Sequence, residues 1–102
     1  MSTPAHHRIR IAKQLWEPRH DATYTPIAST DLCDGDYVLV EAGDVIPADG
    51  EVVEGEALVA GTGTGADSPV LCRRGGDHHS VVSGARVVSS WLVIRVIAHS
   101  SF

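Results

Sequence analysis

Short runs of β-forming residues, punctuated by glycine-aspartate pairs, fill most of the sequence after residue 22. In the last run, residues 91–98, large apolar side chains alternate along the chain. Because successive residues of a strand point to opposite faces, this alternation predicts a strand with one buried face. One face would carry Leu92, Ile94 and Val96, and the other would carry Val93 and Arg95.

The other runs have the composition of short strands, rich in valine, leucine, isoleucine, threonine and tyrosine. They are residues 23–28, 37–41, 51–54, 57–59, 70–72, 81–82 and 86–88. Pro26 has no amide to donate, so residues 23–28 are predicted to form an edge strand. Seven or eight short strands at close spacing predict a mainly β fold, a distorted β-sandwich or jelly-roll-like barrel over residues 23–98.

Glycine and aspartate predict where these strands end. Asp34-Gly35-Asp36 and Gly75-Gly76-Asp77 are typical turn sequences. Asp49-Gly50 predicts a type I′ hairpin turn, because glycine accepts the positive φ that this turn requires, and Gly55-Glu56 predicts a further turn. Residues 60–68 contain glycine at alternate positions and leave few side chains to pack, so an exposed and mobile loop is expected there.

The segment before these strands has a different pattern. Ile11, Leu15 and either Ala12 or Trp16 would share one stripe of a helix, which predicts a short amphipathic helix over residues 6–16. The proline at position 18 would end it, because the residue before a proline is pushed out of the helical region. There is no internal repeat and no break in composition, so residues 1–102 are expected to form a single domain.

The bulk composition excludes several classes of function. Hydrophobic residues make up 43% and charged residues 21%, the balance of an ordinary globular domain. The net charge of −5 argues against nucleic acid as a partner, although four basic residues gather near the start. The longest apolar run, residues 91–94, is far shorter than the roughly 18 residues of a membrane span. With no apolar segment near Met1 that resembles a secretion signal, a cytoplasmic location without membrane insertion is expected.

Side chains that could carry other chemistry have simpler interpretations. Cys33 and Cys72 are not in a metal-ligand or redox spacing and are expected to be free thiols, with a disulfide as the alternative. His78 and His79 would point to opposite faces of a strand, which argues against a shared metal ion. No metal and no cofactor are therefore expected. Structural roles are expected for Ser68 and Ser83 in loops, and for Trp16 and Trp91 in the core or in docking of the helix.

The longest specific motif lies between Asp34 and Gly55. Residues 35–50 have the form Gly-Asp-x-Val-x-Val-x-x-Gly-Asp-x-Ile-Pro-x-Asp-Gly. This pattern resembles the actuator domain of P-type ATPases, in particular that of the catalytic B subunit of the potassium-transporting Kdp ATPases. The resemblance continues through residues 75–77 and 81–94. Similar turns occur in lipoyl-type domains, but those need a lysine at an exposed hairpin tip, and Lys13 is the only lysine here.

The resemblance implies a role for the loop that precedes Ser68. In the family this loop carries Thr-Gly-Glu-Ser, and its glutamate activates the water that hydrolyses an acyl phosphate on a separate domain. The corresponding residues here are Thr64, Gly65, Ala66 and Asp67. Alanine has no proton acceptor, so the resemblance implies a degenerate loop and no catalytic residue. Asp67 is one methylene shorter than glutamate and one position away.

The sequence lacks the other parts of such a pump. It contains no Asp-Lys-Thr-Gly motif, no Walker-type loop and no membrane-spanning run. We therefore expect an isolated, non-catalytic actuator-type domain that is not an enzyme by itself. The partners that the resemblance implies are the phosphorylation and nucleotide domains of a P-type pump. Alternatives are a stand-alone regulatory module for a pump, a small acyl-phosphate hydrolase that uses Asp67, and a gene remnant. Met1 favours a complete gene product over an excised piece, and the oligomeric state is left open.

Overall fold

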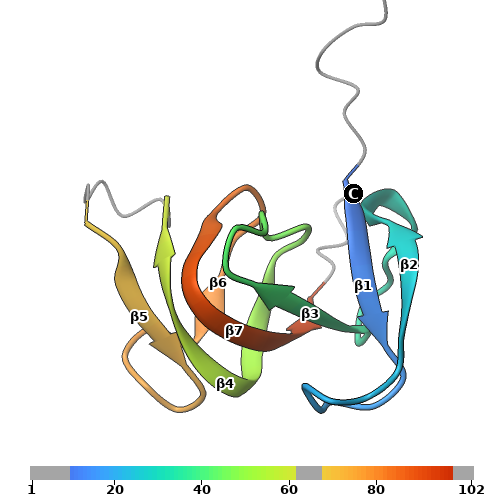
Figure 1. Ribbon diagram of the computed structural model, residues 1–102, viewed down its shortest axis with the longest axis horizontal. Coiled ribbons are helices and arrows are strands. Elements are labelled where there is room, and N and C mark those ends of the chain that lie inside the picture. Colours follow the sequence, from blue (N-terminus) through green and yellow to red (C-terminus); the bar gives the residue numbers. More distant parts are fainter. Residues whose placement is uncertain (1–9, 62–67, 98–102) are drawn as a thin grey trace, which may run out of the picture.

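The computed structural model describes residues 10–61 and 68–97, and these residues form one bent antiparallel sheet (Figure 1). The strands follow the order β2-β1-β3-β7-β4-β5, and β6 pairs with β4 beside this path. The mainly β fold is therefore confirmed. The elements are β1 (Ile11–Leu15), β2 (Tyr24–Ala28), the 3-10 turn η2 (Ser29–Asp31), β3 (Tyr37–Glu41), β4 (Gly50–Ala60), β5 (Val70–Arg73), β6 (Ser80–Val81) and β7 (Arg86–Val96).

The predicted N-terminal helix is wrong, because the chain forms strand β1 there. Ala12 and Leu15 are buried, whereas Ile11 and Trp16 are 69% and 66% exposed. β1 pairs with β2 on one side and with β3 on the other. A helix at this place would leave the edge of β3 without a partner, so the backbone pairing outweighs the helical periodicity. Residues 6–9 of the predicted helix lie outside the described residues.

The edge position of β2 is confirmed. Pro26 lies opposite Lys13 in the β1–β2 ladder. Backbone hydrogen bonds from Trp16 N to Thr23 O (3.3 Å) and from Ser29 N to Arg10 O (2.7 Å) mark hydrogen-bonded pairs on either side of this position. Hydrogen-bonded and non-bonded pairs alternate in an antiparallel ladder, so the nitrogen of Pro26 faces the free edge. The missing amide of proline therefore costs no ladder hydrogen bond.

β4 and β7 form the long central ladder of the sheet. Each has 11 residues, and they pair from Gly50 opposite Val96 to Ala60 opposite Arg86. The sequence predicted two strands in place of each: residues 51–54 and 57–59 for β4, with a turn at Gly55-Glu56 between them, and residues 86–88 and 91–98 for β7. Both divisions are wrong, because each strand is continuous. Two register shifts bend the ladder instead of ending it. Gly55 (φ +87°) and Ser90 (φ +67°) supply the unusual backbone conformations at the bend.

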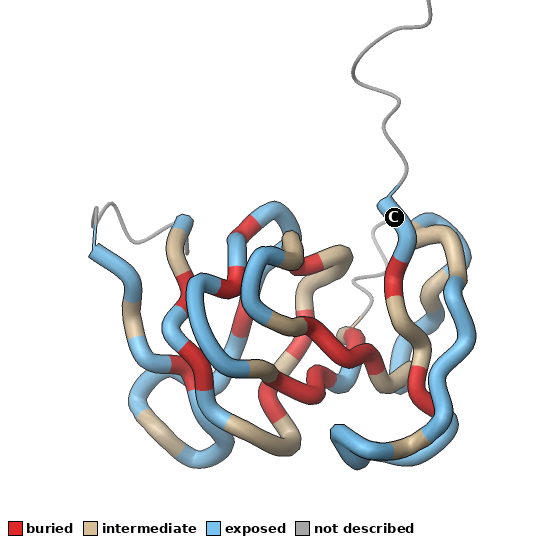
Figure 2. Tube along the Cα trace, viewed as in Figure 1, coloured by how far each residue is buried: buried red, intermediate tan, exposed pale blue. Residues whose placement is uncertain are grey.

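The core lies inside the curl of the sheet, with a smaller apolar cluster on its other face (Figure 2). The predicted alternation in the last strand is confirmed, since Leu92 and Ile94 belong to the main cluster and Val93 to the smaller one, with Leu15 and Leu39. The prediction that only one face is buried is wrong, because Val93 on the other face is 0% exposed. The main cluster consists of Ala12, Val38, Val40, Ile46, Val52, Ala57, Val59, Cys72, Val81, Ala85, Val87, Leu92, Ile94 and Val96.

The turns at Gly35 and Gly75 are confirmed, with φ of +92° and +73°. The predicted type I′ turn at Asp49-Gly50 is wrong, because Gly50 is the first residue of β4 and has no positive φ. A Cβ atom on Gly50 would lie 2.5 Å from the carbonyl oxygen of Arg95 and 2.5 Å from Cγ2 of Ile94. Glycine is needed here because two strands approach closely.

Both cysteines are free thiols, as predicted. Cys72 is 1% exposed in the main cluster, and this burial raises the pKa of its thiol. Cys33 is exposed in the loop before β3. Since the thiolate is the reactive form and must be reached by a reagent, Cys33 is the thiol of the folded chain that a maleimide would label.

Candidate functional site

The β4–β5 hairpin holds the loop that the sequence singled out. The two strands pair as far as Val59 opposite Val70, and residues 61–69 connect β4 to β5. Thr64, Gly65, Ala66 and Asp67 lie outside the described residues, so the degenerate motif stays a prediction from the sequence. Ser68 is exposed at the far stem of the loop, as expected for a loop serine.

A rigid part of the sheet supports the near stem of this loop. Ala60 pairs with Arg86 at the start of β7, and Arg86 also bridges to Val45. Ala85, which precedes Arg86, is 1% exposed, and its carbonyl accepts the amide of Ile46 at 2.7 Å. The backbone on both sides of Arg86 is therefore fixed by buried side chains and hydrogen bonds.

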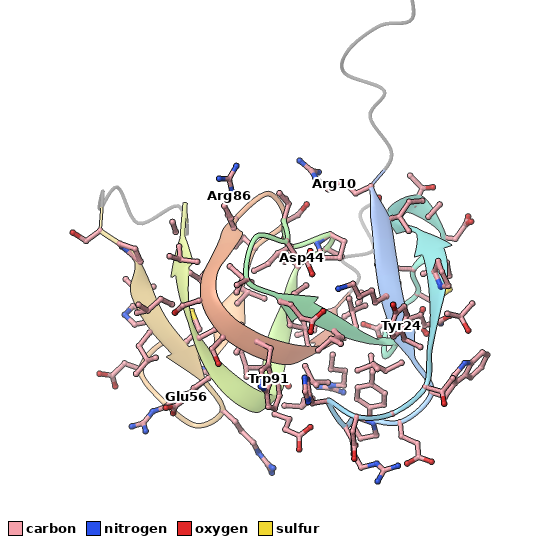
Figure 3. All side chains as sticks on the ribbon, in the orientation of Figure 1. Arg10, Tyr24, Asp44, Glu56, Arg86 and Trp91 are labelled. Atoms are coloured by element: carbon pink, nitrogen blue, oxygen red, sulfur yellow. The ribbon has the colours of Figure 1, made fainter. Side chains whose placement is uncertain are left out.

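The Arg86 side chain is exposed, and no hydrogen bond or ion pair of its guanidinium is found within residues 10–61 and 68–97. Figure 3 shows it directed away from the sheet, at the end of the β4–β7 ladder where Ala60 pairs with Arg86. Arg86 was not among the candidate residues predicted from the sequence. The available signal was a lone arginine at the start of a strand, which is common on protein surfaces.

Lys13 joins β1 to the turn after β3. Its Nζ lies 2.6 Å from Oε1 of Glu41 and 3.3 Å from Oδ2 of Asp44. The same Asp44 oxygen accepts the amide of Glu41 at 2.9 Å. The hydrogen bond to Glu41 is the main cause that raises the pKa of Lys13 above its ordinary 10.5; Asp44 acts in the same direction and burial opposes them. Lys13 therefore stays charged at neutral pH, and its ion pairs with Glu41 and Asp44 hold β1 against the turn after β3.

A cleft of about 700 Å³ lies on the face of the smaller apolar cluster, between the β1–β2 loop and the β4–β7 ladder. Its charged lining includes Glu51 and Arg95, which form an ion pair of 2.8 Å. The β1–β2 loop is held by His20, whose ring stacks on Trp91 at 4.1 Å and whose amide donates to Oε1 of Glu54 at 2.8 Å. Glu51, Arg95 and Glu54 are thus paired with each other or with the backbone, whereas Arg74, which also lines the cleft, has no ion pair among the described residues.

The other predicted side chains fall into two groups. His78, His79 and Ser83 are exposed. The two histidines precede β6 and do not lie in a strand, so the strand assumed for them is wrong. No group of three or more potential metal ligands occurs among the described residues. Trp91 is partly buried against the smaller cluster, which fits a core role. The alternative helix-docking role is wrong, because residues 11–15 form strand β1. The core role predicted for Trp16 is wrong, because its ring is largely exposed and its Nε1 donates to Oγ1 of Thr25 at 3.0 Å. The Trp16 ring therefore lies on the exposed side of the edge strand β2 and outside the core.

Comparison with known proteins identifies the family. Residues 10–101 match the family model of the P-type ATPase actuator domain. The chain belongs to the P-type ATPase actuator domain family. It is 48% identical over 89 residues to the potassium-transporting ATPase ATP-binding subunit of Erwinia tasmaniensis, and the match covers 86% of this chain and 13% of that subunit. The actuator domain of this chain thus spans about an eighth of the length of that relative.

Solved structures agree with this assignment. The chain is similar to a crystal structure of a zinc-transporting PIB-type ATPase, with a TM-score of 0.69 and 29% identity. A second crystal structure of a zinc-transporting PIB-type ATPase, in a different state, gives a TM-score of 0.71 and 27% identity. Both matches cover 87% of this chain and 14% of the other. Within the described residues, no helix has the length and apolarity needed to cross a membrane.

Proposed function

We propose that this chain is a non-catalytic actuator-type domain that binds the phosphorylation domain of a potassium-transporting P-type pump. The family match and the 48% identity to the potassium-transporting ATPase subunit support the choice of partner. The absence of catalysis is proposed because Ala66 occupies the position of the glutamate in the family's motif. An alanine methyl group cannot accept a proton from water, so the general base is missing.

The proposed domain acts by occupying a surface and not by chemistry. It needs no cofactor and is not an enzyme by itself. Its place is on the cytoplasmic side, at the membrane only through the pump. As a stand-alone regulatory module it would compete with the actuator domain that the pump already has. The fixed backbone of the hairpin stem supports such a role, because a rigid surface loses little entropy on binding.

Binding can be measured with a fluorophore on Cys33, which is exposed and distant in sequence from the loop. We expect the labelled chain to gain fluorescence anisotropy when the complete ATP-binding subunit of Erwinia tasmaniensis is added. The dissociation constant should be about 10–100 μM, the range of a transient contact. Unlabelled chain should reverse the change, which controls for binding of the dye. No saturable change would contradict the proposal.

The hydrolase alternative gives a different result in an acyl-phosphate assay. We expect no hydrolysis of acetyl phosphate above buffer by the natural chain or by an Asp67→Asn variant, because Asp67 is one methylene shorter than the family's glutamate and one position away from it in the sequence. A displacement of about 1 Å already costs on the order of a hundredfold in rate. Turnover by the natural chain that disappears in Asp67→Asn would establish the hydrolase instead.

A further inference from the structure

The first register shift in β4 turns one carboxylate onto the face of the cleft. Val52 pairs with Ile94, whereas Glu54, two residues further along, pairs with Val93, because the register shifts between them. Successive residues of β7 point to opposite faces, so Glu54 lies on the face of the smaller apolar cluster. A β-bulge can re-aim a side chain in this way, and bulges are frequent next to active sites. Glu54 consequently lines the cleft.

The cleft contains one cation and one anion that have no ion-pair partner among the described residues. Glu51 and Arg95 are cross-strand partners and neutralise each other. Glu54 accepts the amide of His20 and forms no ion pair. Arg74 lies on the loop between β5 and β6 and is exposed. Glu54 and Arg74 thus line one cleft without pairing with each other, and a ligand that carries both charges would satisfy both.

Apolar side chains complete the lining of the cleft. Pro18 contributes from the β1–β2 loop, Tyr37 from β3 and Val53 from β4. Tyr37 and Val53 pack against the smaller apolar cluster, so their positions are restricted. The volume of about 700 Å³ falls within the range of roughly 300–1,000 Å³ that is typical of small-ligand sites. The cleft therefore has room for a small molecule with an apolar group.

Two loops border the cleft, at the lower end of the sheet in Figure 1. The β1–β2 loop carries Pro18 and is held by the stacking of His20 on the sheet. The loop that carries Arg74 is closed by a backbone hydrogen bond of 3.0 Å from the amide of Arg73 to the carbonyl of His78. Because both loops are already fixed, a ligand would lose little free energy in ordering them.

We propose that the cleft binds a small zwitterion with an apolar side chain, the chemistry of a free hydrophobic amino acid, through Arg74 and Glu54. A guanidinium binds a carboxylate through paired hydrogen bonds, and a carboxylate accepts hydrogen bonds from an ammonium group. The apolar side chain gains free energy when Pro18, Tyr37 and Val53 remove it from water. A ligand with a single charge would be attracted by one of the two groups and repelled by the other, so both ligand charges are needed.

The test is an NMR titration of the complete, isotope-labelled chain with L-phenylalanine at neutral pH. The backbone amide signals of Val53, Glu54 and Gly75 should shift along a saturable curve with a dissociation constant of about 1 mM. Phenylacetate lacks the ammonium group and phenethylamine lacks the carboxylate, so each should bind at least about tenfold more weakly. No saturable shift with phenylalanine, or equal binding of phenylacetate, would overturn the proposal.

Variants of the two charged residues locate the binding site. Arg74→Gln and Glu54→Gln should each weaken phenylalanine binding about tenfold. Glutamine at position 54 still offers an oxygen to the amide of His20, which preserves the β1–β2 loop. Arg73→Gln and Glu56→Gln are the matched controls, because both residues are exposed neighbours of the cleft residues and do not line the cleft. Thermal melting checks that each variant folds.

His79 also lines the cleft and provides a further comparison. His79→Gln should bind phenylalanine as the natural chain does, because its imidazole is not one of the two charges in the proposed site. A loss of binding in His79→Gln, or equal losses in the two control variants and the two cleft variants, would reject the assignment to Arg74 and Glu54.

The inference goes beyond the proposed function and does not depend on it. The pump subunit takes no part in the phenylalanine titration, so a negative result there leaves the proposed binding to the pump intact. Conversely, failure of the labelled chain to bind the pump subunit would leave the cleft as a ligand site of the free domain.

Discussion

Replacing Gly55 with alanine is expected to lower the free energy of unfolding by about 3 kcal/mol. Gly55 has a φ of +87°, and a Cβ atom there would lie 2.6 Å from Cζ3 of Trp91 and 2.7 Å from its carbonyl oxygen. The variant therefore combines backbone strain with overlap on a ring that is itself packed against His20. Denaturant unfolding of the 102-residue chain gives the value.

Gly43→Ala separates the two causes. Gly43 has a φ of +94°, but a Cβ atom there meets nothing within 4 Å. Gly43→Ala should lower the free energy of unfolding by about 1 kcal/mol, which is the strain of the left-handed conformation alone. Equal losses for the two variants would mean that Trp91 does not restrict Gly55. In that case the bend of the central ladder would depend on backbone conformation alone.

Replacing Gly50 with asparagine is expected to cost about 3 kcal/mol as well, for a different reason. Asparagine is among the residues that a type I′ turn prefers, so in the turn suggested by Asp49-Gly50 it would be tolerated. In the structure any Cβ atom at this position overlaps the carbonyl oxygen of Arg95 and the side chain of Ile94. A large loss of unfolding free energy is therefore expected only if β4 and β7 approach each other closely at this position. Denaturant unfolding again supplies the measurement.

Gly75→Asn is the control for this substitution. Gly75 has a φ of +73° and open space around it, and asparagine adopts the left-handed region more readily than most residues. Its cost should stay below about 1 kcal/mol. A small loss for Gly50→Asn, comparable with that for Gly75→Asn, would show that residues 49–50 form a turn after all.

The variants at Gly50 and Gly55 act on stability through contact with β7, because a Cβ atom at either position overlaps atoms of that strand. Arg86 is exposed, so its replacement should leave the free energy of unfolding nearly unchanged.

The candidate site was only partly predictable. The loop and its missing glutamate follow from the motif, because Thr64-Gly65 and the following Ser68 keep the family's order. The exposed apolar surface of Leu58, Leu71 and Val88 was not predictable, because alternation in a strand shows that two faces exist and does not show which strands become neighbours. Leu58, Leu71 and Val88 come together only through pairings of β4 with β5 and β7.

Local chemistry in the sequence was sufficient to determine β3, the edge strand β2 and the turns at Gly35 and Gly75. In each case the deciding forces act between near neighbours, as in the amide of Cys33 that donates to Asp36 at 2.8 Å. The tertiary structure alone decided that residues 11–15 are a strand, that β4 and β7 run unbroken through their bends, and that Gly50 must lack a side chain. Those outcomes depend on hydrogen bonds and contacts between segments far apart in the chain, which local pattern cannot specify.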